Sequence, residues 1–190
     1  MPLKSADGIG WDAGCLVAAD PENLYKLHDW WMKNHGQLTQ DGAFYEYIVL
    51  PTEESRAVLQ RFGVVLLDNF GGDSMADFWI DRAPDGTIKQ LVLEVFPIEE
   101  PENVKESSRH YKLPWQNGMI YLGDPVTFNT LFEEMPTYLD FKAKHHSHNF
   151  MLNDMLITDL PQKGIFNVWS YGDDPEPDGM DSVVVFDRQS

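Results

Sequence analysis

The strongest constraint on the fold is a pair of strand-like stretches, "ADFWIDR" (76–82) and "TIKQLVLEVF" (87–96), around a four-residue turn. Both stretches are rich in β-branched and aromatic residues, which favour strands. The intervening Ala83-Pro84-Asp85-Gly86 has the composition of a turn. We therefore expect the two stretches to pair as an antiparallel hairpin. Apolar residues alternate imperfectly in 87–96, as expected for a strand covered on both faces.

Helix signals occur at three other places in the chain. Residues 20–36 begin with Asp20 as N-cap and Pro21 at the first helical position, and Gly36 supplies a stop. Thr52 caps a second expected helix, over 52–63, and Asp124-Pro125 opens a third, over 124–135. We therefore expect about three helices.

Short strands are expected elsewhere from β-branched, aromatic or alternating composition. They fall at 43–50, 64–68, 119–122, 137–144, 165–169 and 182–187. The last two should form a closing pair, whereas 148–160 fits either a strand or a helix. Residues 97–118 are expected to be a long connection.

These elements predict one α+β domain over residues 1–190 with a mostly antiparallel or mixed central sheet. Hydrophobic residues make up 43% of the 190-residue chain, which is enough to build a core. Residues 1–19, rich in Gly and Ala, are expected to be a loose leader. Residues 137–190 are expected to be a β-rich C-terminal extension.

Charge limits the partners that such a domain can have. The chain carries 31 acidic against 14 basic residues, a formal net charge of −17. Nucleic acid and anionic membrane surfaces should repel it, whereas a basic protein should be attracted. The N-terminus has no apolar signal region, and no stretch approaches 18 apolar residues. With Cys15 as the only cysteine, these features favour a soluble cytoplasmic protein.

No motif in the sequence specifies a reaction. Neither a phosphate-binding glycine loop nor a G-x-S-x-G nucleophile elbow is present, and no cofactor is expected. No electropositive neighbour marks Cys15 as an activated thiol.

Three histidines, His145, His146 and His148, lie within four positions. In an extended segment His146 and His148 share a face, and a metal would need a third ligand such as His110 or Asp154. A polar strand end is the alternative interpretation. We expect no preorganised metal site here, and the enzymatic alternative is a small metal-dependent hydrolase using His146 and His148.

Residues 69–100 resemble the central hairpin of the SUKH superfamily, which includes bacterial immunity proteins and fungal cell-wall synthesis regulators. The similar parts are Gly71-Gly72-Asp73, the strand 77–81, Pro84-Asp85-Gly86 and the strand 91–94, with a later helix like "TFNTLFEEM" (127–135). The resemblance implies a non-enzymatic α+β binding module, often paired with a toxin, and it names no catalytic residues.

Two acidic runs are candidate contact surfaces for a basic partner. The hairpin run flanks Trp79 and consists of Asp73, Asp77, Asp81 and Asp85. The loop run consists of Asp173, Asp174, Glu176 and Asp178. On a strand, Asp77 and Asp81 share a face with Trp79, and an aromatic beside charges is typical of a binding hot spot. The loop run fits a solubilising role equally well.

The sequence thus predicts a non-catalytic acidic interaction module, such as an immunity protein or inhibitor that covers a basic partner like a nuclease toxin.

Overall fold

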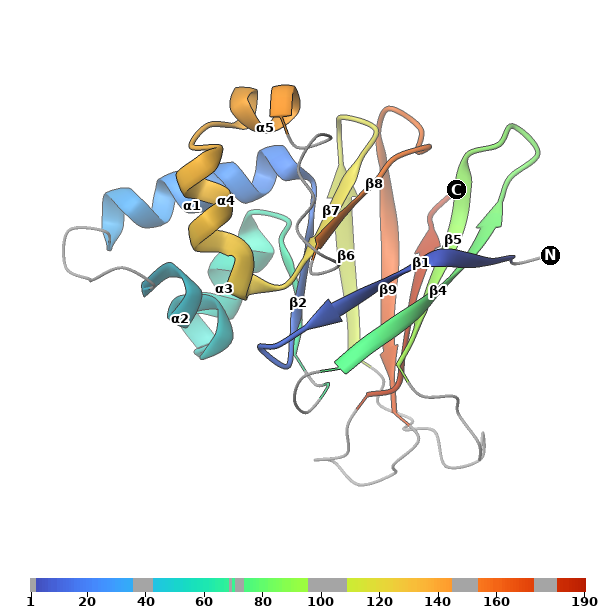
Figure 1. The fold of residues 1–190 in the computed structure, drawn as a ribbon, viewed down its shortest axis with the longest axis horizontal. Coiled ribbons are helices and arrows are strands. Elements are labelled where there is room, and N and C mark those ends of the chain that lie inside the picture. The colour runs from blue at the N-terminus through green and yellow to red at the C-terminus, as the bar shows by residue number, and fades with distance from the viewer. Residues whose placement is uncertain are drawn as a thin grey trace.

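Two antiparallel sheets lie against each other in the computed structural model (Figure 1), which describes residues 3–35, 43–68, 70, 74–95, 109–144, 154–172 and 181–190. The larger sheet has six strands in the order β1-β4-β5-β10-β9-β6. Its strands are β1 (Leu3–Trp11), β4 (Ser74–Arg82), β5 (Ile88–Glu94), β10 (Val183–Arg188), β9 (Gly164–Tyr171) and β6 (Arg109–Trp115). The smaller sheet has the order β3-β2-β7-β8 and consists of β3 (Val65–Leu67), β2 (Leu16–Ala19), β7 (Ile120–Gly123) and β8 (Asp154–Ile157).

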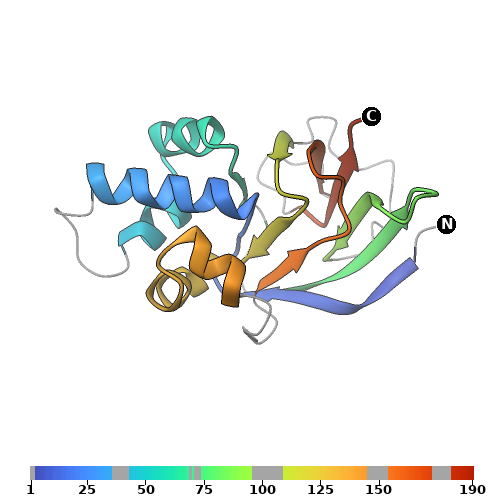
Figure 2. The same ribbon diagram turned by 90° about the horizontal axis from the view of Figure 1, so that it is seen from above.

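A helical layer covers the other face of the four-stranded sheet, so the molecule has three layers (Figures 1 and 2). The helices are α1 (Pro21–Asn34), α2 (Ala43–Val49), α3 (Glu53–Arg61), α4 (Phe128–Glu134) and α5 (Tyr138–Lys144), with a 3-10 turn over Pro125–Thr127 before α4. None of the helices in these described ranges is both long and apolar enough to span a membrane.

The four-stranded sheet is buried on both faces because it lies between two hydrophobic cores. On β2, Leu16 and Ala18 pack into the core between the sheets, whereas Val17 and Ala19 pack against the helices. All four side chains are fully buried. A strand buried on both faces has no alternation of polar and apolar residues, so the sequence pattern does not identify it as a strand.

Asp20 fixes the start of α1 and connects it to the sheets. Its buried carboxylate accepts hydrogen bonds from the backbone N–H of Glu22 at 2.9 Å and of Gln116 at 2.8 Å. The first bond caps the helix, as the sequence predicts. The second reaches the connection after β6, so one side chain ties two layers together.

Most of the predicted elements are confirmed. β4 and β5 form the expected antiparallel hairpin, with Phe78 opposite Leu93. The helix predictions at 20–36, 52–63 and 124–135 correspond to α1, α3 and α4, although Gly36 lies outside the described residues. Strands are also confirmed at β3, β7 and the antiparallel pair β9–β10, and 148–160 contains strand β8. The fold is a single α+β domain, with five α-helices rather than about three.

Two strand predictions are wrong because short helices replace them. Residues 43–50 contain α2, whose buried Phe44 and Ile48 are spaced four apart, a helical interval. Residues 137–144 contain α5, where Leu139 is 71% exposed and Phe141 is buried, so the apparent alternation does not define a face. Thr137 and Asp140 exchange side-chain-to-backbone hydrogen bonds at the start of α5. This reciprocal cap stabilises the helical start.

Three other expectations are also corrected. Residues 3–11 and 16–19 of the expected leader form β1 and β2, and the expected connection 97–118 contains β6. Residues 137–190 are not an appended extension, because β9 and β10 lie inside the six-stranded sheet between β5 and β6. The sequence does not indicate β1, because its glycines and Asp7 are residue types that strands rarely contain. The ladder of β1 with β4 is irregular between Lys4 and Gly8. Gly8 lies close to β4: an added Cβ would be 3.0 Å from the carbonyl oxygen of Ala76.

Candidate functional site

One row of side chains crosses five strands on the face of the six-stranded sheet that points away from the four-stranded sheet. We call this face the outer face. From strand to strand the row contains Trp79, Val92, Val185, Trp169 and His110. Residues directly opposite one another on neighbouring antiparallel strands share a face and are close enough to interact. The row therefore brings together residues from β4, β5, β10, β9 and β6.

The row is only partly covered, unlike the layer beneath it. Trp79 and Trp169 are each half-buried and His110 is exposed, whereas neighbours such as Phe78 and Val168 point inward and are fully buried. The His110 and Trp169 rings stack with their centroids 4.0 Å apart. The outer face thus presents flat aromatic surface on a rigid sheet.

Carboxylates flank the row on both sides. Asp77 lies opposite Glu94 on one side of it. On the other side, Asp81 lies opposite Gln90, which in turn lies opposite Asp187 of β10. The outer face therefore combines aromatic and aliphatic side chains with four carboxylates.

Cations also belong to this region, since Lys4 of the edge strand β1 lies directly opposite Trp79 in the register. Lys89 is 3.9 Å from the Asp81 carboxylate. Lys112 lies opposite Asn167, beyond Asp187, near the β6 edge of the sheet. The acidic part of the outer face is therefore the part formed by β4, β5 and β10.

The predicted hairpin residues do not all belong to this surface. Asp77, Trp79 and Asp81 share the outer face, as predicted. Asp85 lies instead at the hairpin turn, where its carboxylate accepts hydrogen bonds from the Thr87 hydroxyl at 2.6 Å and the Thr87 backbone N–H at 2.9 Å. These bonds lower the pKa of the Asp85 carboxyl and indicate a role in shaping the turn.

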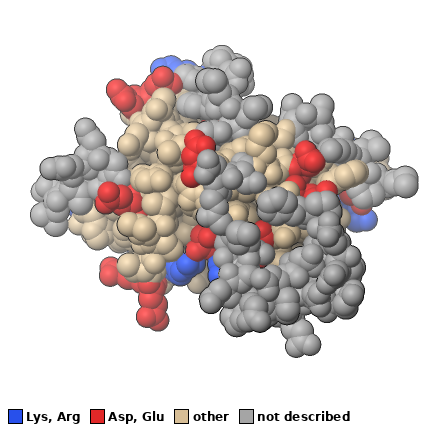
Figure 3. Space-filling model, turned by 60° about the horizontal axis from the view of Figure 1, so that its bottom comes forward, with Lys and Arg blue, Asp and Glu red and all other residues tan. Residues whose placement is uncertain are grey.

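The remaining predicted acids are Asp73, Asp173, Asp174, Glu176 and Asp178, which lie outside the described residues. Described acidic side chains form separate small groups on the face shown in Figure 3, with uncharged residues between them. No continuous acidic patch is formed by the described residues on that face. The outer face is characterised by its aromatic row with carboxylates beside it.

The histidine cluster also lies outside the described residues, because His145, His146 and His148 fall in 145–153. The two residues considered as alternative third metal ligands belong to different sheets. His110 is on β6 of the six-stranded sheet, and Asp154 is on β8 of the four-stranded sheet. Within the described ranges, no group of three or more His, Cys, Asp or Glu is arranged to hold a metal.

Cys15 is buried in the core between the helices and the four-stranded sheet. Burial, with smaller contributions from Asp124 and Asp68, raises the pKa of its thiol to about 12. The nucleophilic thiolate is therefore scarce at neutral pH. Cys15 acts as a small apolar residue of the core.

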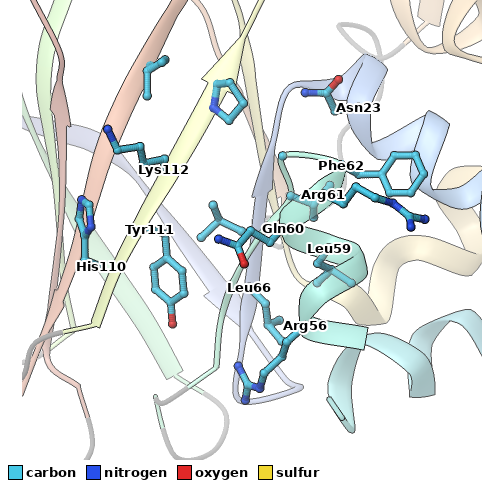
Figure 4. Close-up of a pocket in the computed structure, with 15 residues that line it drawn as sticks. Asn23, Arg56, Leu59, Gln60, Arg61, Phe62, Leu66, His110, Tyr111 and Lys112 are labelled. Atoms are coloured by element: carbon cyan, nitrogen blue, oxygen red, sulfur yellow. The ribbon is translucent and has the colours of Figure 1, made fainter. Parts of the chain in front are cut away.

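A pocket of about 830 Å³ lies between α3 and β6 (Figure 4). We call it the seam pocket because the β3 edge of one sheet approaches the β6 edge of the other there. The sequence does not predict it: Arg56 and Tyr111 come together only through the tertiary fold.

No family model, no curated protein and no solved structure matches this chain. The SUKH resemblance of residues 69–100 and 127–135 therefore stays a prediction.

Proposed function

We propose that the protein is a non-catalytic interaction module that binds a basic protein partner through the outer face of its six-stranded sheet. The observation that carries this proposal is the row from Trp79 to His110, partly exposed and flanked by carboxylates. Tryptophan and tyrosine dominate binding hot spots because they bury a large area at little cost in conformational entropy.

The chemistry of the row suits cationic side chains on the partner. A guanidinium group stacks favourably on an indole ring, and each nearby carboxylate adds a charge-assisted hydrogen bond. Trp79 has Asp77 and Asp81 two residues away on either side along β4. An arginine placed on Trp79 would therefore be within reach of a carboxylate.

Net charge supports the same class of partner through long-range attraction. A formal charge of −17 accelerates encounter with a basic protein and slows encounter with nucleic acid. A nuclease toxin is such a protein, because binding phosphates requires a basic surface. Together with the SUKH resemblance, this favours a cytoplasmic immunity protein or inhibitor.

The proposal is tested by measuring affinity for the product of the neighbouring gene and for a panel of basic nucleases. Trp79→Ala and Trp169→Ala should each weaken binding by about 30-fold, the effect of losing a hot spot of about 2 kcal/mol. Leu139→Ala is the matched control, since Leu139 is an exposed apolar residue in the helical layer. Equal affinity of all three variants and the wild type would reject the outer face as the binding site.

A further inference from the structure

The seam pocket shares His110 and Lys112 with the β6 margin of the outer face, but it differs in charge from the part of that face formed by β4, β5 and β10. α3 forms one wall and β6 the other (Figure 4). We propose that the seam pocket binds a small organic anion, with an apolar or aromatic body between the walls and a carboxylate or phosphate group at the end lined by Arg56 and Tyr111.

Cationic side chains surround the seam pocket, although the chain as a whole is strongly acidic. Arg56, Arg61 and Lys112 are among its lining residues, and among the described residues that line it none is acidic. Arg56 and Arg109 share the Asp68 carboxylate, at 2.5 Å and 2.6 Å. Among the described lining residues the seam pocket therefore has three cationic side chains and no carboxylate. A cleft with low-dielectric walls focuses such a charge on an entering anion.

Of the two lining arginines, Arg56 is better placed than Arg61 to hold the anionic group. The Arg56 side chain keeps 46% of its surface exposed. Figure 4 shows the Tyr111 side chain at the same end of the pocket as Arg56. Arg61, by contrast, lies over the rings of Trp30 and Phe62, 5.2 Å from each centroid.

The walls suit the apolar part of such a ligand. Leu59, Leu66, Pro114 and Ile165 line the pocket. Figure 4 shows the Gln60 side chain reaching into the space between α3 and β6, where its amide could orient a polar substituent. The volume of about 830 Å³ falls within the range of about 300–1,000 Å³ that is typical of small-molecule sites.

The test is isothermal titration calorimetry at low salt with four probes: 1-naphthyl phosphate, 1-naphthoate, uncharged 1-naphthol and inorganic phosphate. We expect one naphthyl anion per chain to bind, and the tighter of the two identifies the head group. Arg56→Gln should weaken that binding by about tenfold or more, since a charge-assisted hydrogen bond is lost. Arg82→Gln is the matched control, because Arg82 is 45% exposed and also paired with an aspartate.

A second variant keeps the test independent of the Arg56 ion pair. Gln60→Glu changes one exposed side chain to a carboxylate of the same shape and should reduce anion binding by a similar factor. The proposal is overturned if neither naphthyl anion binds, or if 1-naphthol binds as tightly as the anions. It is equally overturned if inorganic phosphate binds as tightly, or if Arg82→Gln weakens binding as much as Arg56→Gln.

Discussion

Replacing Gly164 with alanine should destabilise the protein by about 2–4 kcal/mol, although the substitution adds a single methyl group. Gly164 of β9 lies directly opposite Trp115 of β6. A Cβ at position 164 would lie 2.3 Å from Cζ2 and 2.6 Å from Cη2 of the Trp115 ring. Real Cβ contacts of this length do not occur, so the ring or the β9 backbone must move.

The Trp115 ring cannot move freely, and this sets the magnitude. It is 2% exposed, packs against Phe166 with centroids 4.7 Å apart, and donates a hydrogen bond from Nε1 to the Pro161 carbonyl at 2.8 Å. Overpacking a core costs about 1–3 kcal/mol, and the loss of a buried hydrogen bond costs about 0.5–1.5 kcal/mol more.

Urea unfolding of the wild type, Gly164→Ala, Trp115→Leu and the double variant isolates the energy of the clash between the added methyl group and the indole. Trp115→Leu removes the indole, so Gly164→Ala in that background should cost under about 1 kcal/mol. Gly86→Ala is a control for backbone strain without a clash: Gly86 has a φ of +87°, and an added Cβ meets nothing within 4 Å. If Gly164→Ala costs the same with and without the indole, the reasoning is refuted.

Three further predictions concern titratable residues. The His28 ring stacks on Phe132 with centroids 3.8 Å apart, and burial lowers the pKa of His28 below 6.5. The contribution of His28 to stability is therefore present above pH 6.5 and is lost as the pH falls. The urea midpoint should fall more between pH 7.5 and pH 5.5 in the wild type than in His28→Gln. Iodoacetamide should leave Cys15 unmodified in the folded protein, as read by mass spectrometry, and alkylate it in 6 M urea; rapid labelling without denaturant would contradict the raised thiol pKa. The three clustered histidines are His145, His146 and His148. Replacing all three with alanine should leave the unfolding midpoint and the zinc content unchanged. Stoichiometric zinc that disappears in the triple variant would support the hydrolase alternative.

Elements with local signals were predictable from the sequence, as the β4–β5 hairpin shows. Its turn and both of its strands lie within about twenty consecutive residues, and Asp20 and Thr52 cap helices with their own side chains. The start of α5 also has a local signal, the reciprocal cap of Thr137 and Asp140. The alternation of polar and apolar residues in 137–144 nevertheless predicts a strand there.

The strand order, by contrast, has no local signal. Trp79 and Trp169 belong to one surface only because β10 inserts between β5 and β9. The sequence does not predict β6, because Pro114 and the charged residues around it are unusual in a strand. β6 lies at the edge of the sheet, where a strand tolerates both. The seam pocket depends on two sheet edges meeting, so its residues share no sequence pattern.

The central claim is that a basic protein binds the outer face, and the kinetics of the double variant Asp77→Lys and Asp187→Lys test it most directly. Its matched control is Asp29→Lys with Glu133→Lys, which reverses two exposed charges on α1 and α4 in the helical layer. Association is measured by stopped flow against the neighbouring gene product between 10 mM and 500 mM salt, as the Debye length falls from about 30 Å to a few Å.

We predict that the outer-face variant associates about tenfold more slowly than the control at 10 mM salt, since charges beside an interface act mainly on encounter. The difference between the variants should shrink toward 500 mM salt, where screening removes the steering. Equal association rates for the outer-face variant and the helical-layer control at every salt concentration would contradict the claim.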